Sequence, residues 1–232
     1  NSLILISILA SALIILKSIL ILNNKASLIS VDINNLITLQ TSIIIISFLT
    51  LVSAFIISDF SLITVYQNSH TLKPLIYKIA GTWGNHEGSL LMWIALMSIF
   101  SFLFFTKKNH YKREYYFFTL IAQTSLILLF LIFLIFSSNP FLKILPEPME
   151  GLGLNPILQD PALAIHPPLL YIGFVGSSIY FSAAIGALMS NIDGADFAKS
   201  KKPKIILRSE GSFGDASGLS FCPRTPRGDI YL

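Results

Sequence analysis

Residues 36–57 read LITLQTSIIIISFLTLVSAFII, a run of 22 residues without a charged side chain. A helix needs about 20 mostly apolar residues to cross the hydrocarbon layer of a membrane. Four more stretches meet this requirement, and among them only the first holds a charge, Lys17 near one end. These stretches are residues 2–22, 89–106, 117–136 and 169–189. The sequence therefore predicts five membrane-spanning segments.

The composition points to the same class. Of the 232 residues, 53% are apolar and 12% are charged, and the mean hydropathy is +0.72. Soluble domains carry about 25% charged residues, so a water-soluble enzyme is excluded. One cysteine excludes a disulfide scaffold and a Cys-ligated metal cluster. Because backbone groups in lipid must pair internally and no barrel-type alternation is present, we predict an all-α, polytopic membrane helix bundle.

The basic residues predict how the bundle is oriented. Twelve of the 16 Lys and Arg residues lie in residues 23–35, 107–116 and 191–232, and three lie in residues 58–88 and 137–168. Cytoplasmic segments of membrane proteins are enriched in Lys and Arg. We therefore expect the N-terminus and the two long loops to face outward and the C-terminal tail to face inward. This placement explains the net charge of +4, and we expect membrane lipid, not nucleic acid, as the partner surface.

The outward loops, 31 and 32 residues long, are longer than most connections and are where a function is expected. The first loop ends in residues 83–88, WGNHEG. Trp83 is either an interfacial anchor or part of a site. His86 and Glu87 lie at the membrane edge, where ionisable groups tend to face protein or a cavity. They equally suit a structural pair that seats the next helix, with Glu87 complementing its dipole.

The second loop ends in residues 155–171, NPILQDPALAIHPPLLY. The residue before a proline is disfavoured in helical geometry, so we expect His166 to be extended. Proline suits the first turn of a helix, so Pro167 and Pro168 are expected to start the fifth span. His166 would then lie at the outer rim beside a helix N-terminus, which favours a neutral imidazole able to bind a metal. A hydrogen-bonded structural histidine is the alternative.

Small residues recur at intervals of four in the fifth span. They form two series, Gly173 and Ser177, then Ser178, Ser182 and Gly186. Small side chains let helices approach closely in lipid. We expect them to serve helix packing.

Both loops resemble the cytochrome c assembly proteins of the CcmF type, which act in haem attachment to c-type cytochromes. The motifs that carry the resemblance in the first loop are DFS at 59–61, NS at 68–69, LIYK at 75–78 and WGNHEGSLLMW at 83–93. Those in the second loop are NPF at 139–141, GLGLNPILQDP at 151–161 and AIHPPLLY at 164–171. The resemblance extends from near residue 1 to about residue 200.

The resemblance implies a role in cytochrome c maturation. In that family haem reaches the outer face of the membrane and is joined to apocytochrome c, so the chain would be a component of a haem lyase. His166 would be an axial ligand to the iron of a non-covalent, b-type haem. The residues expected to support it are Pro167, Pro168, Tyr171 and Asp160, and those expected to be structural or accessory are Trp83, His86, Glu87 and Trp93.

The resemblance also implies partners and a location. The partners would be apocytochrome c, a haem-delivering chaperone and other maturation subunits. The location would be the bacterial inner membrane, with the long loops in the periplasm, or else the mitochondrial inner membrane. A related assembly protein that serves a nitrite reductase shares the same motifs.

Residues 199–232 differ from what the resemblance implies after the first five spans. A sixth span and a Trp-rich segment are expected there, but the tail is polar and rich in Gly and Ser, which favours disorder. We therefore divide the chain into an assembly domain at 1–198 and a disordered tail. We expect a truncation or frame shift after about residue 200, or a second chain that supplies the rest. The fragment alone is then expected to be inactive.

Two other functions are compatible with five spans. A transporter or proton-translocating subunit would place charged residues in the middle of its spans, whereas here only Lys17 lies within one. A purely structural assembly subunit would use its small-residue faces to bind other proteins.

Overall fold

The computed structural model describes residues 1–24, 30–106, 112–153 and 161–191. Over these residues the chain forms seven helices, and the only β-type pairing is an isolated bridge between Leu62 and Lys143. Five helices are long and apolar enough to span a membrane. They are α1 (Ser2–Leu22), α2 (Ile33–Ile57), α5 (His86–Phe105), α6 (Arg113–Ser137) and α7 (Pro161–Met189). The predicted all-α membrane bundle is confirmed.

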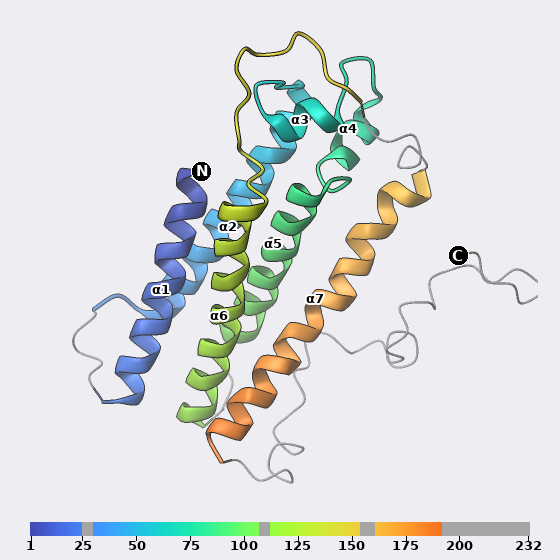
Figure 1. The fold of residues 1–232 in the computed structure, drawn as a ribbon. Coiled ribbons are helices and arrows are strands. Elements are labelled where there is room, and N and C mark those ends of the chain that lie inside the picture. Colours follow the sequence, from blue (N-terminus) through green and yellow to red (C-terminus); the bar gives the residue numbers. More distant parts are fainter. Residues whose placement is uncertain (25–29, 107–111, 154–160, 192–232) are drawn as a thin grey trace, which may run out of the picture.

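The long helices lie side by side, as Figure 1 shows. Two short helices, α3 (Ile63–Asn68) and α4 (Leu75–Gly81), lie at one end of the bundle. The start of α5 and the start of α7 lie at this same end. We call it the outer end, because it carries both long loops. The predicted span 2–22 matches α1, whereas the other four helices begin three to eight residues before the predicted spans.

The bundle interior contains polar as well as apolar side chains. Its apolar centre includes the fully buried Phe55, Ile94 and Leu131. Gln40 on α2 donates from Nε2 to Ser11 Oγ on α1 at 2.5 Å. Lys17 is also buried, with 6% of its surface exposed, near the end of α1 that lies away from the long loops.

The start of α7 contradicts the prediction for His166. The helix begins at Pro161 and continues through Pro167 and Pro168, so His166 is helical and lies in the second turn. The steric bias against helix before proline is a preference. In membranes, neighbouring groups can satisfy the backbone atoms that a helical proline leaves unpaired. The dipole argument for His166 weakens as well, because the field of a helix end decays within its first turn.

The two long loops join into a single cap at the outer end. Backbone N–H groups of the second loop donate to carbonyls of the first: Ile144 to Ser61 at 2.9 Å, and Leu152 to Tyr66 at 2.8 Å. Another bond runs the other way, from Ile63 to the carbonyl of Leu142 at 2.9 Å. These bonds hold the loops beside the start of α5.

A carboxylate adds a side-chain contact between the loops. Glu150 accepts hydrogen bonds from the backbone N–H of Thr71 at 3.0 Å and from its hydroxyl at 2.5 Å. The Thr71 hydroxyl is the main cause that lowers the pKa of Glu150 to about 2. Nearby, burial lowers the pKa of Lys73.

Two sequence predictions fall outside the described residues. Asp160, expected to support a site, and the tail at 199–232 both lie in segments that the structure does not describe.

Candidate site at the rim between α5 and α7

The turn that leads into α5 is fixed by a side-chain cap. Asn85 accepts a hydrogen bond at its Oδ1 from the backbone N–H of Gly88 at 2.7 Å. This satisfies one of the donors that a helix start leaves unpaired. A Cβ at Gly88 would lie 1.6 Å from the carbonyl oxygen of Thr82, so only glycine fits there. The first turn of α5 is therefore folded tightly against the residues that precede it.

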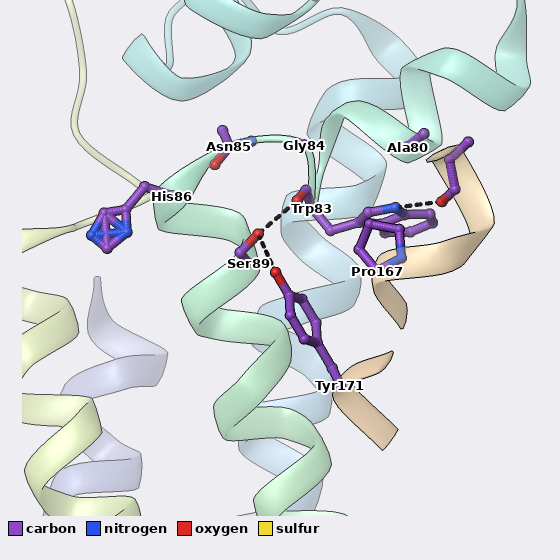
Figure 2. Close-up of a pocket in the computed structure, with 9 residues that line it drawn as sticks. Ala80, Trp83, Gly84, Asn85, His86, Ser89, Pro167 and Tyr171 are labelled. Carbon is purple, nitrogen blue, oxygen red and sulfur yellow. Dashed lines mark hydrogen bonds between the residues drawn. The ribbon is translucent and has the colours of Figure 1, made fainter. Parts of the chain in front are cut away.

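Trp83 projects from this turn toward α7. Its indole Nε1 donates to the carbonyl of Ala164 at 2.8 Å. Its own carbonyl accepts a hydrogen bond from Ser89 Oγ at 2.6 Å. Figure 2 shows both bonds, with the indole reaching from the α5 side to the start of α7. The outer ends of the two helices are thus joined through one aromatic side chain.

Tyr171 makes a second contact between the two helices. Its hydroxyl lies 3.4 Å from Ser89 Oγ, and its ring meets Trp93 edge-on at a centroid distance of 5.6 Å. Trp93 packs on its other side against Phe130 of α6, at 6.2 Å. Trp93 is therefore a packing residue in the bundle, whereas Tyr171 has its polar end at the rim.

A cleft of ≈ 440 Å³ opens between these groups. This volume lies in the range of small-molecule sites, roughly 300–1,000 Å³. Residues from α4, the turn before α5, α5 itself and α7 line it. They are Ala80, Trp83, Gly84, Asn85, His86, Ser89, Ala164, Pro167 and Tyr171.

His86 and Glu87 are adjacent in the first turn of α5, but their side chains have different surroundings. The His86 ring lies away from Pro167 and Tyr171 in Figure 2, and its Nε2 is 3.3 Å from Ser138 Oγ at the end of α6. Glu87 is half-buried in the first turn of α5, where its charge complements the helix dipole. Asn85, rather than these two residues, caps the helix.

His166 lies on a different face of α7 from the cleft. The cleft is lined by Ala164, Pro167 and Tyr171, which share one side of the helix, and His166 is not among its lining residues. The His166 side chain is exposed and has no hydrogen bond to another residue that the structure describes. Pro168 is half-buried beside it.

The surface around His166 is open and apolar. Leu169, three residues on, is 52% exposed. Gly173, seven residues on, has no neighbouring atom within 4 Å of the position that a Cβ would take. An exposed imidazole beside an open apolar face suits a large apolar ligand that needs a nitrogen donor for its metal. Among the described residues no group of three or more His, Cys, Asp and Glu side chains forms a metal site.

The predicted residues thus separate into two groups. The structure brings Trp83, Pro167 and Tyr171 together at the cleft, and it places His166 on the opposite, exposed face of α7. Sequence analysis missed the connecting roles of Ser89 and Ala164. Neither has a distinguishing pattern, although Asn85 directly before a helix is a recognisable capping signal.

The chain matches the family model described as cytochrome C assembly protein over residues 83–210. It is 45% identical over 161 residues to the cytochrome c-type biogenesis protein CycK of Bradyrhizobium diazoefficiens, covering 69% of this chain and 24% of the relative. It is 43% identical over 158 residues to CcmF of Escherichia coli, covering 68% of this chain and 24% of CcmF. The chain spans about a quarter of the length of these relatives.

Two further matches extend the comparison. A probable cytochrome c-type biogenesis protein NrfE of Escherichia coli is 40% identical over 160 residues, with 67% of this chain and 28% of NrfE covered. A solved structure of the cytochrome c haem lyase CcmF has a similar fold, with a TM-score of 0.67 at 22% identity. The match covers 83% of this chain and 30% of that structure.

Proposed function

From the premise that this chain belongs to the cytochrome c assembly protein family, we propose that it acts in cytochrome c maturation. Its role there would be to hold haem at the outer rim of the membrane. Haem is the substrate, and His166 would supply one axial nitrogen to its iron. The observation that carries the proposal is the exposed imidazole of His166, which lies at the rim above an open apolar face. Haem would be held there non-covalently, as a b-type haem, before transfer.

The chemistry asked of this chain is positioning. Adding a thiol across a haem vinyl group needs no electron donor, so the rate depends on holding the reacting groups close and oriented. His166 would fix the iron, and the exposed side chains of Leu169 and its neighbours would cover the porphyrin face. His166 would supply a single nitrogen donor to the haem iron. We therefore propose that this chain is one component of a haem lyase.

The proposed partners follow from the substrate. They are apocytochrome c, a haem-delivering chaperone and other maturation subunits.

The excess of Lys and Arg at the end away from the long loops supports an outer end in the periplasm of a bacterial inner membrane. A membrane-impermeant thiol reagent should therefore label a Met149→Cys variant in intact cells and leave an Asn23→Cys variant unlabelled, both in a Cys222→Ser background.

The test of haem binding uses the whole chain in lipid nanodiscs, titrated with haem and followed by its Soret absorbance. His166→Ala should reduce haem retention by about tenfold or more, since losing one axial ligand removes at least about 1.4 kcal/mol. His86→Ala is the matched control, because its ring lies toward Ser138 on the far side of α5. Equal haem retention in the native chain and His166→Ala would overturn the proposal.

A further inference from the structure

Pro168 leaves a gap in the hydrogen bonding of α7. In an α-helix each backbone N–H donates to the carbonyl four residues earlier. Pro168 has no N–H, so the carbonyl of Ala164 lacks the donor that its own helix would normally supply. Ala164 is 4% exposed, and a buried carbonyl without a partner is costly.

The Trp83 indole fills this gap. Its Nε1 lies 2.8 Å from the Ala164 oxygen, the distance of an ordinary N–H···O bond. Figure 2 shows the bond ending at the start of α7, beside Pro167. The donor that one helix lacks is thus supplied by the turn that precedes another.

The indole is itself held in place. The Trp83 backbone N–H donates to the Ala80 carbonyl at 3.2 Å, and its carbonyl accepts from Ser89 Oγ at 2.6 Å. Both bonds tie the Trp83 backbone to its immediate surroundings, so the point from which the indole extends is held in place. A donor in the turn before α5 and an acceptor on α7 define how the first turns of α7 are rotated about the helix axis.

That rotation decides where His166 points. Ala164, Pro167 and Tyr171 are drawn toward α5, and His166, two residues after Ala164, is consequently turned to the exposed face. We propose that Trp83 is a positioning residue, which replaces the missing Pro168 amide and thereby orients the turn that carries His166. This inference rests on the proposed haem role of His166 for its functional meaning, whereas the hydrogen-bond substitution stands on geometry alone.

A double-mutant cycle tests the substitution. Trp83→Phe removes the indole N–H and keeps an aromatic ring, and Pro168→Ala restores a backbone N–H that can donate to the Ala164 carbonyl. Hydrogen–deuterium exchange of the backbone amides in residues 161–171 reports how firmly this turn is held. Trp83→Phe should raise exchange by roughly fivefold in the native background, the equivalent of one lost hydrogen bond. In the Pro168→Ala background it should raise exchange by less than about twofold.

A control variant separates the effect of ring packing on amide exchange from the effect of the hydrogen bond. Trp93→Phe alters only ring contacts with Tyr171 and Phe130 among the contacts described, so its effect should be the same in both backgrounds. An equal effect of Trp83→Phe in both backgrounds would show that the indole acts by packing, and would overturn the inference. A second measurement needs no Trp83 variant: Pro168→Ala alone should shift the ¹⁵N–¹H resonance of the Trp83 indole, and an unchanged resonance would likewise overturn it.

The functional part has its own readout. Trp83→Phe should weaken haem retention severalfold in the native background and leave it unchanged beside Pro168→Ala. If Trp83→Phe left haem retention unchanged while His166→Ala reduced it, the positioning role would be overturned. Haem retention that ignores His166→Ala, with the exchange cycle still coupled, would instead refute the proposed function and leave the substitution of the amide supported.

Discussion

The inner half of α7, residues 175–189, lies closely against α6. The outer half, residues 161–174, meets α5 through a few polar and aromatic contacts. In the inner half, Gln123 of α6 donates to Ser178 Oγ at 3.1 Å and accepts from Ser182 Oγ at 2.8 Å. In the outer half, the Trp83–Ala164 bond and the Tyr171 contacts face an open cleft. One helix thus combines a fixed half with a half that leaves room for a ligand.

The two series of small residues on α7 also differ in burial. Ser182 and Gly186 are buried against α6, whereas Gly173 and Ser177 are exposed. The expected packing role therefore applies to the series that begins at Ser178. The series that begins at Gly173 leaves an open surface below His166, which is the face proposed for haem.

Substitution of Gly186 should give the largest effect. A Cβ there would lie 2.0 Å from Thr119 Oγ1 and 2.9 Å from the Thr119 backbone nitrogen. The hydroxyl can rotate away but the backbone cannot, so Gly186→Ala should force α6 and α7 apart. We expect a loss of about 2 kcal/mol or more in the free energy of unfolding, measured by thermal or denaturant unfolding in detergent.

Gly173→Ala is the matched control for that experiment. The same substitution on the same helix meets no atom within 4 Å. Because alanine favours helix over glycine, the free energy of unfolding should be unchanged or raised by up to about 1 kcal/mol. Equal losses from the two variants would show that the halves of α7 do not differ in packing as described.

The hydrogen bonds of Gln123 with Ser178 and Ser182, here called the polar clamp, should contribute less to stability than the close packing at Gly186. Gln123→Leu deletes both hydrogen bonds to α7, and interhelical bonds in membranes contribute about 0.6 kcal/mol each on average. We therefore expect a loss of about 1 kcal/mol, with little further loss when Ser182→Ala is added, as unfolding measurements on the single and double variants would show. Among the residues that the structure describes, the Ser177 hydroxyl bonds only to the carbonyl of Phe174 in its own helix. Ser177→Ala should therefore change stability by less than about 0.5 kcal/mol. If Gln123→Leu changed the free energy of unfolding as little as Ser177→Ala, the contribution assigned to the polar clamp would be wrong.

The inner half was easier to predict from the sequence than the outer half. Length and hydropathy identify the five spans because lipid imposes one requirement on all of them, paired backbone groups in an apolar helix. The spacing of Ser178, Ser182 and Gly186 likewise indicates packing. The partner, Gln123, was not predicted, since periodicity within one helix does not specify which neighbour it faces.

The outer half departs from the local rules because tertiary contacts override them. His166 precedes a proline and was expected to be extended, but it is helical. The proline rule treats the chain alone, whereas the carbonyl that Pro168 leaves unpaired is satisfied by a tryptophan 81 positions away in the sequence. Local sequence therefore predicts which residues lie near the rim, but not the face on which each lies.

The smallest expected effect concerns the loops at the outer end, where a titratable group makes the contact. The Thr71 hydroxyl and backbone hold the pKa of Glu150 at about 2, below its ordinary value of 4.5. A carboxyl with a lowered pKa stabilises the folded state above pH 4.5, and this contribution is lost as the pH falls toward about 2. Thr71→Val removes the hydroxyl and should move the titration of Glu150 upward, as its side-chain ¹³C shift would report. The clamp in the inner half has no titratable group, so the α6–α7 contact should not change over the same pH range; coupled changes in both regions would mean that the outer contacts and the inner packing form one unit.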